Sequence, residues 1–141
     1  MSAYPVILEP AQEGGFVVTF PDVPEAITQG DNETEALMMA QDALVAMFDS
    51  YMQDRQAIPE ASSVYGQPCV VFPVTLAGKI ALYNTMLAVN MSPDDLAFRL
   101  DITPKLAERL LSLRQKNRIE QIENALAFFG KRLVVDVREV A

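Results

Sequence analysis

The chain has 141 residues, of which 50% are hydrophobic and 21% charged, a composition typical of one globular domain or two small ones. It has no histidine, which excludes Ser-His and Cys-His nucleophile pairs and any zinc site that uses histidine. Its single cysteine, Cys69, excludes a disulfide framework and a cysteine-ligated cluster within one chain. We expect no metal and no cofactor. With no targeting segment and no apolar run long enough for a bilayer, we expect a cytoplasmic protein without a membrane partner.

Charge is divided unevenly along the chain. Residues 1–78 carry eleven acids and one base, a net charge of −10, and residues 79–141 carry ten bases and eight acids, a net charge of +2. An acidic half attracts a basic surface and repels nucleic acid, whereas a half with basic edges can approach phosphates. The asymmetry is consistent with two partners of opposite charge, and equally with an acidic domain beside a neutral one.

The first half begins with a predicted hairpin. Residues 4–8 and 16–20 are apolar and contain β-branched or aromatic side chains, as strands do. The turn between them includes Gly14 and Gly15, which supply positive φ angles. Residues 26–29 can form a short third strand.

A long helix is predicted next, over residues 33–53. Asn32 is a suitable N-cap, with Glu35 three residues later in a capping-box pattern, and apolar residues recur at helical spacing. A strand over residues 67–76 follows, in which Cys69 is expected to be a small buried hydrophobe rather than a nucleophile. The order β-β-β-α-β predicts an α+β layer, with one small, mostly antiparallel sheet and the helix on one face.

The second half is predicted to be helical. Residues 76–78 are the expected junction, and a first helix is expected over residues 79–89. Ser92 followed by proline and two acids is a strong helix start, and this second helix is expected to end at Leu100.

A third helix is expected to begin after Thr103, which is also followed by proline, and to end near residue 115. Two short capped helices joined by a tight turn are the pattern of a helix-turn-helix. Asp101 stands where the turn often has glycine, but aspartate tolerates the left-handed conformation. The alternative is an ordinary helical hairpin with a solvated polar face.

The third helix combines an apolar face with a polar one, which a recognition helix needs to reach base edges in the major groove. Arg109 is expected to contact a base because its planar fork can pair with both acceptors of a guanine. Thr103 at the helix start and the remaining cations are suited to phosphates. The predicted DNA-binding residues are Thr103, Lys105, Arg109, Ser112, Arg114, Lys116 and Arg118.

A fourth helix is predicted over residues 118–129, with Gly130 directly after it. Residues 133–140 then read as a strand, which would be an exposed edge in a helical domain. Pairing with the same strand of a second copy removes that edge, so we expect a homodimer. Pairing of the N-terminal domains as well would give a tetramer.

Several short motifs of this sequence occur together in one known family. They are Tyr4-Pro5-Val6, Gly14-Gly15-Phe16-Val17-Val18, Phe20-Pro21-Asp22-Val23-Pro24, Thr28-Gln29-Gly30-Asp31 and Glu35-Ala36. They resemble the N-terminal pattern of HicB antitoxins. Ile58-Pro59 and Ser62-Ser63 resemble its closing motif, in which Ala61 replaces a second proline. Residues 118–126 and 130–133 resemble HicB members with a repressor-like helix-turn-helix.

The resemblance implies a fold and a function. HicB proteins neutralise HicA, a small basic toxin that cleaves mRNA, through an N-terminal domain that resembles a degenerate RNase H fold and covers the toxin's active site. Their C-terminal domain binds operator DNA and represses the antitoxin's own operon. The resemblance thus implies a non-enzymatic antitoxin with a toxin-binding domain at residues 1–75 and a DNA-binding and dimerisation domain at residues 79–141.

Two other hypotheses remain open at this stage. An RNase H-like nuclease would bind metal through carboxylates, for which Asp22, Asp31 and Asp42 are available, although no spacing makes them converge. A transcription factor with a small-molecule sensor domain would have the same organisation in two halves.

Overall fold

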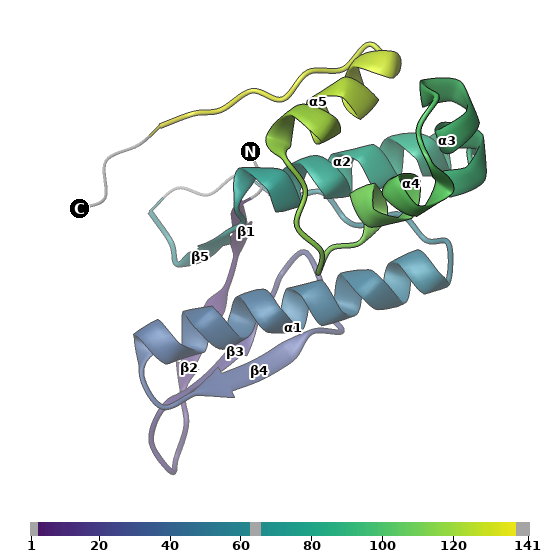
Figure 1. The fold of residues 1–141 in the computed structure, drawn as a ribbon. Coiled ribbons are helices and arrows are strands. Elements are labelled where there is room, and N and C mark those ends of the chain that lie inside the picture. The colour runs from purple at the N-terminus through teal and green to yellow at the C-terminus, as the bar shows by residue number, and fades with distance from the viewer. Residues whose placement is uncertain (1–2, 63–65, 138–141) are drawn as a thin grey trace. The chain divides into compact units, whose positions relative to one another are not determined.

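The computed structural model describes residues 3–62 and 66–137 and divides into two compact units (Figure 1). The N-terminal unit spans Ser2–Phe72, and the helical unit begins at Pro73. The described residues form a mixed α and β structure with five helices and two small sheets.

The strands of the described residues all lie in the N-terminal unit. They are β1 (Ala3–Pro5), β2 (Ile7–Pro10), β3 (Phe16–Thr19), β4 (Ile27–Gly30) and β5 (Cys69–Val71). Antiparallel pairing gives one sheet in the order β2-β3-β4, which contains the predicted hairpin and third strand, and a second sheet of β1 and β5.

The expectation of a single sheet is wrong, because the predicted first strand divides at Val6. Pro5 has no N–H with which to continue a ladder. The backbone N–H of Val6 instead donates to the carbonyl oxygen of Pro68 at 3.0 Å. Residues before Val6 therefore pair with β5, and residues after it pair with β3.

Helix α1 covers Glu33–Gln53, the predicted span, and packs against β3 and β4 (Figure 1). Its predicted N-cap is confirmed, because the side-chain oxygen of Asn32 accepts a hydrogen bond from the backbone N–H of Glu35 at 2.9 Å. The face turned to the core consists of Ala36, Ala40, Leu44, Val45 and Phe48.

An aromatic cluster fills the core of the N-terminal unit. The ring centroid of Tyr4 lies 5.4 Å from that of Phe48 and 5.5 Å from that of Phe72, and Phe48 and Phe72 are 5.9 Å apart. All three residues are buried. They come from β1, from α1 and from the position directly after β5, so the cluster joins the sheet of β1 and β5 to the helix.

Two glycines of the quoted motifs stand where the backbone comes very close to another segment. A Cβ atom on Gly30 would lie 2.4 Å from the backbone nitrogen of Ala36, at the start of α1. A Cβ atom on Gly15, whose φ is +74°, would lie 2.4 Å from the carbonyl oxygen of Gly30. These contacts let the hairpin turn, β4 and α1 meet without side chains between them.

The helical unit contains α2 (Val74–Ala88), α3 (Pro93–Leu100), α4 (Pro104–Leu111) and α5 (Ile119–Phe128). Its core is aliphatic and is built around Leu82, Leu96, Leu110, Ile122 and Leu126. No helix of the described residues is long and apolar enough to cross a membrane.

The boundary between β5 and α2 differs from the sequence prediction. The strand expected over residues 67–76 contains only Cys69–Val71, and the helix expected from Lys79 begins at Val74. Pro73 explains both differences, because it cannot donate to a strand ladder but is tolerated at the start of a helix. Cys69, expected to be buried, is half-buried.

Gly78 is not a junction residue, because it lies inside α2 and is buried. A Cβ atom there would lie 2.8 Å from Cγ2 of Ile122 and 3.2 Å from Cδ1 of Leu133. The glycine therefore permits close packing of α2 against α5 and the segment that follows it.

The end of the chain agrees with prediction as far as α5 and Gly130, whose φ is +71°. Residues 131–137 form no strand within the described chain, and residues 138–140 of the predicted strand lie outside the described residues. Leu133 is half-buried against the helical core, whereas Val134, Val135 and Val137 are exposed.

Candidate nucleic-acid interface

Helices α3 and α4 are two capped helices joined by a tight turn. Ser92 caps α3, because its hydroxyl accepts from the N–H of Asp95 and the Asp95 carboxylate accepts from the N–H of Ser92, both at 3.1 Å. These bonds stabilise the carboxylate and lower the pKa of Asp95. At the other end Asp101 adopts the predicted left-handed conformation, with φ +55°. The N–H of Ile102 then closes the turn by donating to the carbonyl of Ala97 at 3.0 Å.

Helix α4 begins at the predicted N-cap. The hydroxyl oxygen of Thr103 accepts from the N–H of Leu106 at 3.1 Å, which leaves the hydroxyl proton available for another acceptor. Ala107 and Leu110 face the core and are buried. Lys105 and Arg109 are exposed. The helix thus has the two faces predicted from its sequence.

The end of α4 differs from the prediction, because the helix ends at Leu111 rather than near residue 115. Ser112 is the C-cap and has an extended backbone, with ψ 119°. Residues 112–118 then form a connection to α5, which we call the basic connection because it contains Arg114, Lys116 and Arg118.

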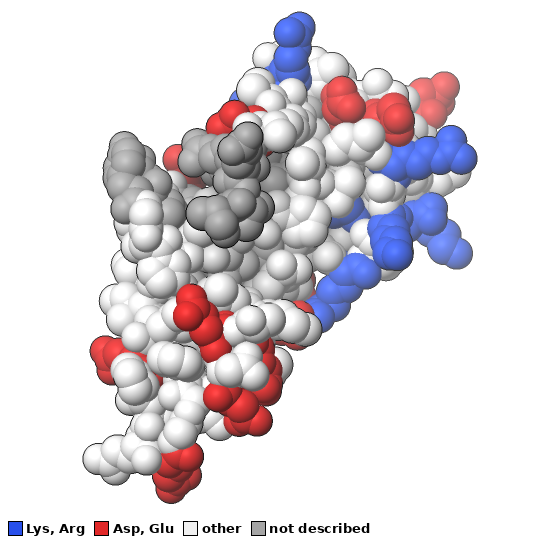
Figure 2. Space-filling view, turned by 90° about the vertical axis from the view of Figure 1, so that its left-hand side faces the viewer, with Lys and Arg blue, Asp and Glu red and all other residues white. Residues whose placement is uncertain are grey.

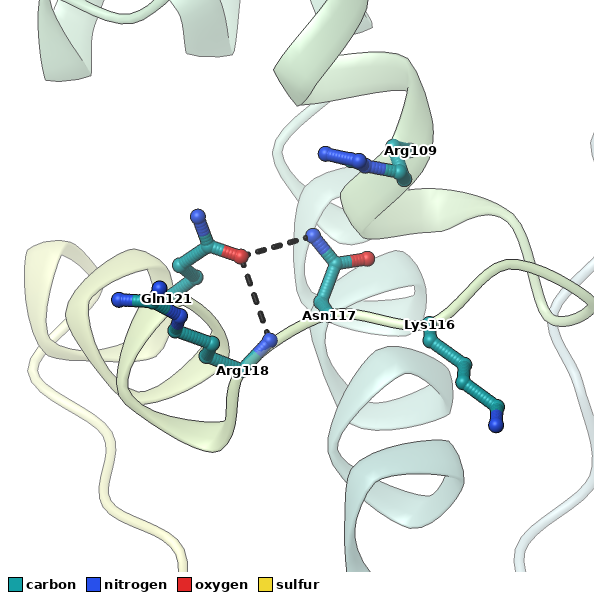
Figure 3. A pocket seen from close by; sticks show the side chains of 5 residues that line it. All are labelled: Arg109, Lys116, Asn117, Arg118 and Gln121. Atoms are coloured by element: carbon teal, nitrogen blue, oxygen red, sulfur yellow. Dashed lines mark hydrogen bonds between the residues drawn. The ribbon is translucent and has the colours of Figure 1, made fainter.

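Two surface hollows bring most of the predicted residues together. Thr103, Lys105 and Arg109 line a hollow of about 200 Å³ with Leu106 and Gln115. A hollow of about 630 Å³ is lined by Arg109, Lys116, Asn117, Arg118 and Gln121 (Figure 3). Arg109 belongs to both, so it joins the helix face to the basic connection.

The larger hollow has a defined polar wall. The side-chain oxygen of Gln121 accepts from Nδ2 of Asn117 at 3.0 Å and from the backbone N–H of Arg118 at 3.3 Å (Figure 3). These two bonds fix the start of α5 relative to the basic connection. Lys116 points away from Arg109 in this view (Figure 3).

The remaining two predicted residues line neither hollow. Ser112 is half-buried at the helix end, and its carbonyl oxygen accepts a hydrogen bond from the ammonium of Lys79. Arg114 is exposed within the basic connection.

Lys79 belongs to this region but was absent from the predicted set. It lies on α2 and is only 2% exposed. Its ammonium donates to the carbonyl oxygens of Arg109 at 2.9 Å and Ser112 at 2.7 Å, and also to that of Gln115. Burial, followed by the positive charge of Arg109, lowers the pKa of Lys79 to about 8. Its signal in the sequence is a single lysine in an otherwise uncharged helix, between Gly78 and Ile80.

The N-terminal unit presents a surface of the opposite charge. Acidic side chains predominate over this unit in Figure 2, and most of the basic side chains in that view lie over the helical unit. The net charge of residues 2–72 is −10, since all eleven acids and the one base of the first half lie there.

One of these acids has a structural role. Both carboxylate oxygens of Asp22 accept hydrogen bonds from Ser62, one from its backbone N–H at 2.7 Å and one from its hydroxyl. The hydroxyl of Tyr4 donates to the carbonyl of Pro59 at 2.7 Å. Two motifs at the start of the unit are thereby tied to the closing motif, of which Ser63 lies outside the described residues.

The three carboxylates considered for a nuclease belong to different elements. Asp22 is bound to Ser62, Asp31 precedes the cap of α1, and Asp42 lies within α1. Among residues 3–62 and 66–137, no group of three His, Cys, Asp or Glu side chains is placed to hold a metal ion.

Comparison with known proteins gives the same family that the sequence motifs resemble. Residues 3–81 match the family described as the HicB-like antitoxin of bacterial toxin-antitoxin systems. The chain is 46% identical to Antitoxin HicB 2 of Photorhabdus laumondii over 130 residues, which covers 92% of each chain. It is also 37% identical to Antitoxin HicB of Escherichia coli over 131 residues, 92% of this chain and 95% of that one.

The chain therefore belongs to the HicB-like antitoxin family. Membership gives it the role of an antitoxin, not of an enzyme, and implies a toxin as partner.

Proposed function

We propose that the chain neutralises a HicA-type mRNA-cleaving toxin by covering the toxin's active site with the N-terminal unit, which we take to be a degenerate RNase H-like domain. The observation that carries this proposal is the net charge of −10 on that unit. A ribonuclease must attract a polyanion, so its substrate-binding surface is basic and complementary to an acidic protein.

The test measures toxin-catalysed RNA cleavage and complex formation with the full chain and with a fragment ending at Pro73. This fragment keeps β5 and Phe72, which complete the second sheet and the aromatic cluster. The folded fragment is expected to bind and inhibit the toxin alone, with an association rate that falls as salt is added. Inhibition by the full chain and none by the folded fragment would refute this division of labour.

We also propose that α3 and α4 form a helix-turn-helix that binds operator DNA, so that the antitoxin represses its own operon. The carrying observation is the pair of capped helices with Thr103, Lys105 and Arg109 exposed on the second. Thr103 would bind a phosphate at the helix start and Arg109 a base edge. Ser112, Arg114, Lys116 and Arg118 would bind phosphates beside them.

The test is a binding titration of the full chain with DNA from its own promoter and with unrelated DNA at fixed salt. Tighter binding to the promoter DNA supports the proposal. Equal affinity for both sequences would leave only charge-driven, nonspecific binding and refute operator recognition.

Operator binding of this kind requires two copies, because one helix-turn-helix contacts only a few base pairs. We propose that residues 133–140 pair with the same segment of a second chain, together with α5, to form a homodimer. Val134 and Val137 support this, since they are 80% and 89% exposed and would be covered by the partner segment.

A chain that ends at Leu133 tests the dimer proposal. It keeps the half-buried leucine that packs on the helical core and removes the exposed valines. Sedimentation is expected to give monomers for this variant and dimers for the full chain. Dimers that persist would place the interface elsewhere.

A further inference from the structure

We propose that Lys79 is the positioning residue of the DNA-binding surface: its ammonium fixes the end of α4 and the basic connection, so that their cations meet DNA as one surface. This inference rests on the proposed operator binding. It assigns a function to a buried side chain that cannot itself reach a phosphate, because it is only 2% exposed.

The geometry of the ammonium supports this role. A lysine ammonium has three N–H donors, and the three carbonyls of Arg109, Ser112 and Gln115 use all of them. These carbonyls lie at intervals of three residues, so the contacts span the last turn of α4 and the first part of the basic connection. One side chain from α2 thus ties together two consecutive segments.

Electrostatics favours a cation at this point. The last carbonyls of a helix have no partners within the helix and form the negative end of its dipole. A buried ammonium against these groups offsets part of the cost of removing its charge from water. An apolar side chain in its place would leave the same carbonyls without this donor.

The tied carbonyls flank the residues that are expected to touch DNA. Arg109 carries one of them, Arg114 lies between the other two, and Lys116 directly follows Gln115. The connection is neither helix nor strand, so no regular ladder of hydrogen bonds sets its course. Releasing Lys79 should therefore let these side chains spread over more conformations, and DNA binding would have to order them again.

The experiment compares full-length Lys79→Met with the matched variant Lys105→Met, which removes an exposed lysine from α4. Two quantities are measured for each: the dissociation constant for promoter DNA, and the rate of trypsin cleavage after Arg114 and Lys116. Cleavage after Arg55 in the N-terminal unit is the internal control. Trypsin reports local opening of the basic connection in the absence of DNA.

We expect Lys79→Met to speed cleavage of the basic connection and to weaken operator binding, each by about tenfold, the factor that corresponds to about 1.4 kcal/mol. Lys105→Met should weaken binding without changing cleavage. Unchanged cleavage in Lys79→Met, or faster cleavage with unchanged operator affinity, would overturn the positioning role.

Acetylation of lysines in the unchanged full-length chain gives an independent measurement if Lys79→Met does not fold. Lys79 should react at least about tenfold more slowly than Lys105 and Lys116, because enclosure and three hydrogen bonds outweigh the larger neutral fraction that its lowered pKa gives. Equal reactivity would overturn the inference. Failure of the unchanged chain to bind its promoter would instead refute the proposed operator function, while faster cleavage of the basic connection in Lys79→Met would still identify Lys79 as the residue that holds the connection.

Discussion

The two units of this antitoxin are built and charged in different ways. The N-terminal unit packs Tyr4 and Phe72, from the sheet of β1 and β5, against Phe48 of α1, and its net charge is −10. The helical unit has an aliphatic core, a net charge of +2 over residues 73–141, and Lys79 as a buried cation. Such a difference implies that damage to one unit should impair one partner interaction and leave the other.

The largest effect is expected from Phe48→Ala, which removes the centre of the aromatic cluster. Phe48 is fully buried, so the cavity should cost about 3–5 kcal/mol of unfolding free energy. Toxin inhibition should be lost while promoter binding persists. Thermal unfolding and both binding assays measure this.

Leu126→Ala is the matched variant in the helical unit, where Leu126 is 1% exposed. It should cost about 2–5 kcal/mol and produce the reverse pattern, with promoter binding lost and toxin inhibition retained. Loss of both activities in either variant would show that the units do not act separately.

Gly30→Ala should have the next largest effect. The added Cβ would lie 2.4 Å from the backbone nitrogen of Ala36, and backbone cannot move aside as a flexible side chain can. We expect a loss of about 3 kcal/mol in chemical denaturation of the N-terminal unit.

Gly14→Ala is the control for Gly30→Ala. Gly14 has a φ of +96°, but a Cβ atom there would meet nothing within 4 Å. Its substitution adds backbone strain without a clash, and should cost about 1 kcal/mol. An equal loss in both variants would show that β4 and α1 do not need their close approach.

Local signals in the sequence were sufficient for most of the helices. The caps at Asn32, Ser92 and Thr103 all form as predicted, because a cap depends on residues only a few positions away. The left-handed turn at Asp101 is also local. These features determine α1, α3 and the start of α4.

Features that depend on distant contacts were not predictable in this way. The strand after Tyr4 divides because Val6 bonds to Pro68, which is far along the chain. Gly78 resembles a linker residue in sequence, but the structure needs a glycine there because a Cβ atom would come too close to Ile122. The early end of α4 coincides with the carbonyls bound by Lys79, and a pattern read along one helix does not reveal a donor on another.

In the helical unit, Arg109→Ala tests whether a single side chain recognises a base. If Arg109 pairs with a guanine, the variant should lose about 1–3 kcal/mol of operator binding and discriminate less between bases. Lys116→Ala should instead weaken binding to all sequences alike and reduce the salt slope by about one unit. Titrations at several salt concentrations separate the two, and an unchanged base preference in Arg109→Ala would remove Arg109 from base recognition.

The smallest effect is expected from Tyr4→Phe, which keeps the ring in the aromatic cluster and removes one hydroxyl. The carbonyl of Pro59 then loses its donor, at a cost of about 0.5–1.5 kcal/mol. The loss should depend on pH. Burial, followed by the negative charges of Asp22 and Glu60, raises the pKa of Tyr4 from 10.0 to about 12.

The sign of this dependence follows from proton binding. Between pH 10 and about 12 the folded chain keeps a proton on Tyr4 that the unfolded chain has released, so stability falls as pH rises through this window. Tyr4→Phe should remove that part of the slope, as measured by denaturant unfolding at a series of alkaline pH values.

Two other groups change the pH dependence of stability in the same range. Lys79, with its pKa lowered from 10.5 to about 8, contributes a slope of opposite sign, which cancels when the variant is compared with the unchanged chain. Burial, followed by the hydrogen bond to Glu25, raises the pKa of Tyr51 to about 12. Tyr51 therefore contributes the same loss of stability at alkaline pH in Tyr4→Phe and in the unchanged chain. Tyr51→Phe therefore serves as the companion variant. An alkaline slope in Tyr4→Phe equal to that of the unchanged chain would mean that the Tyr4 hydroxyl is not held in its buried hydrogen bond to Pro59.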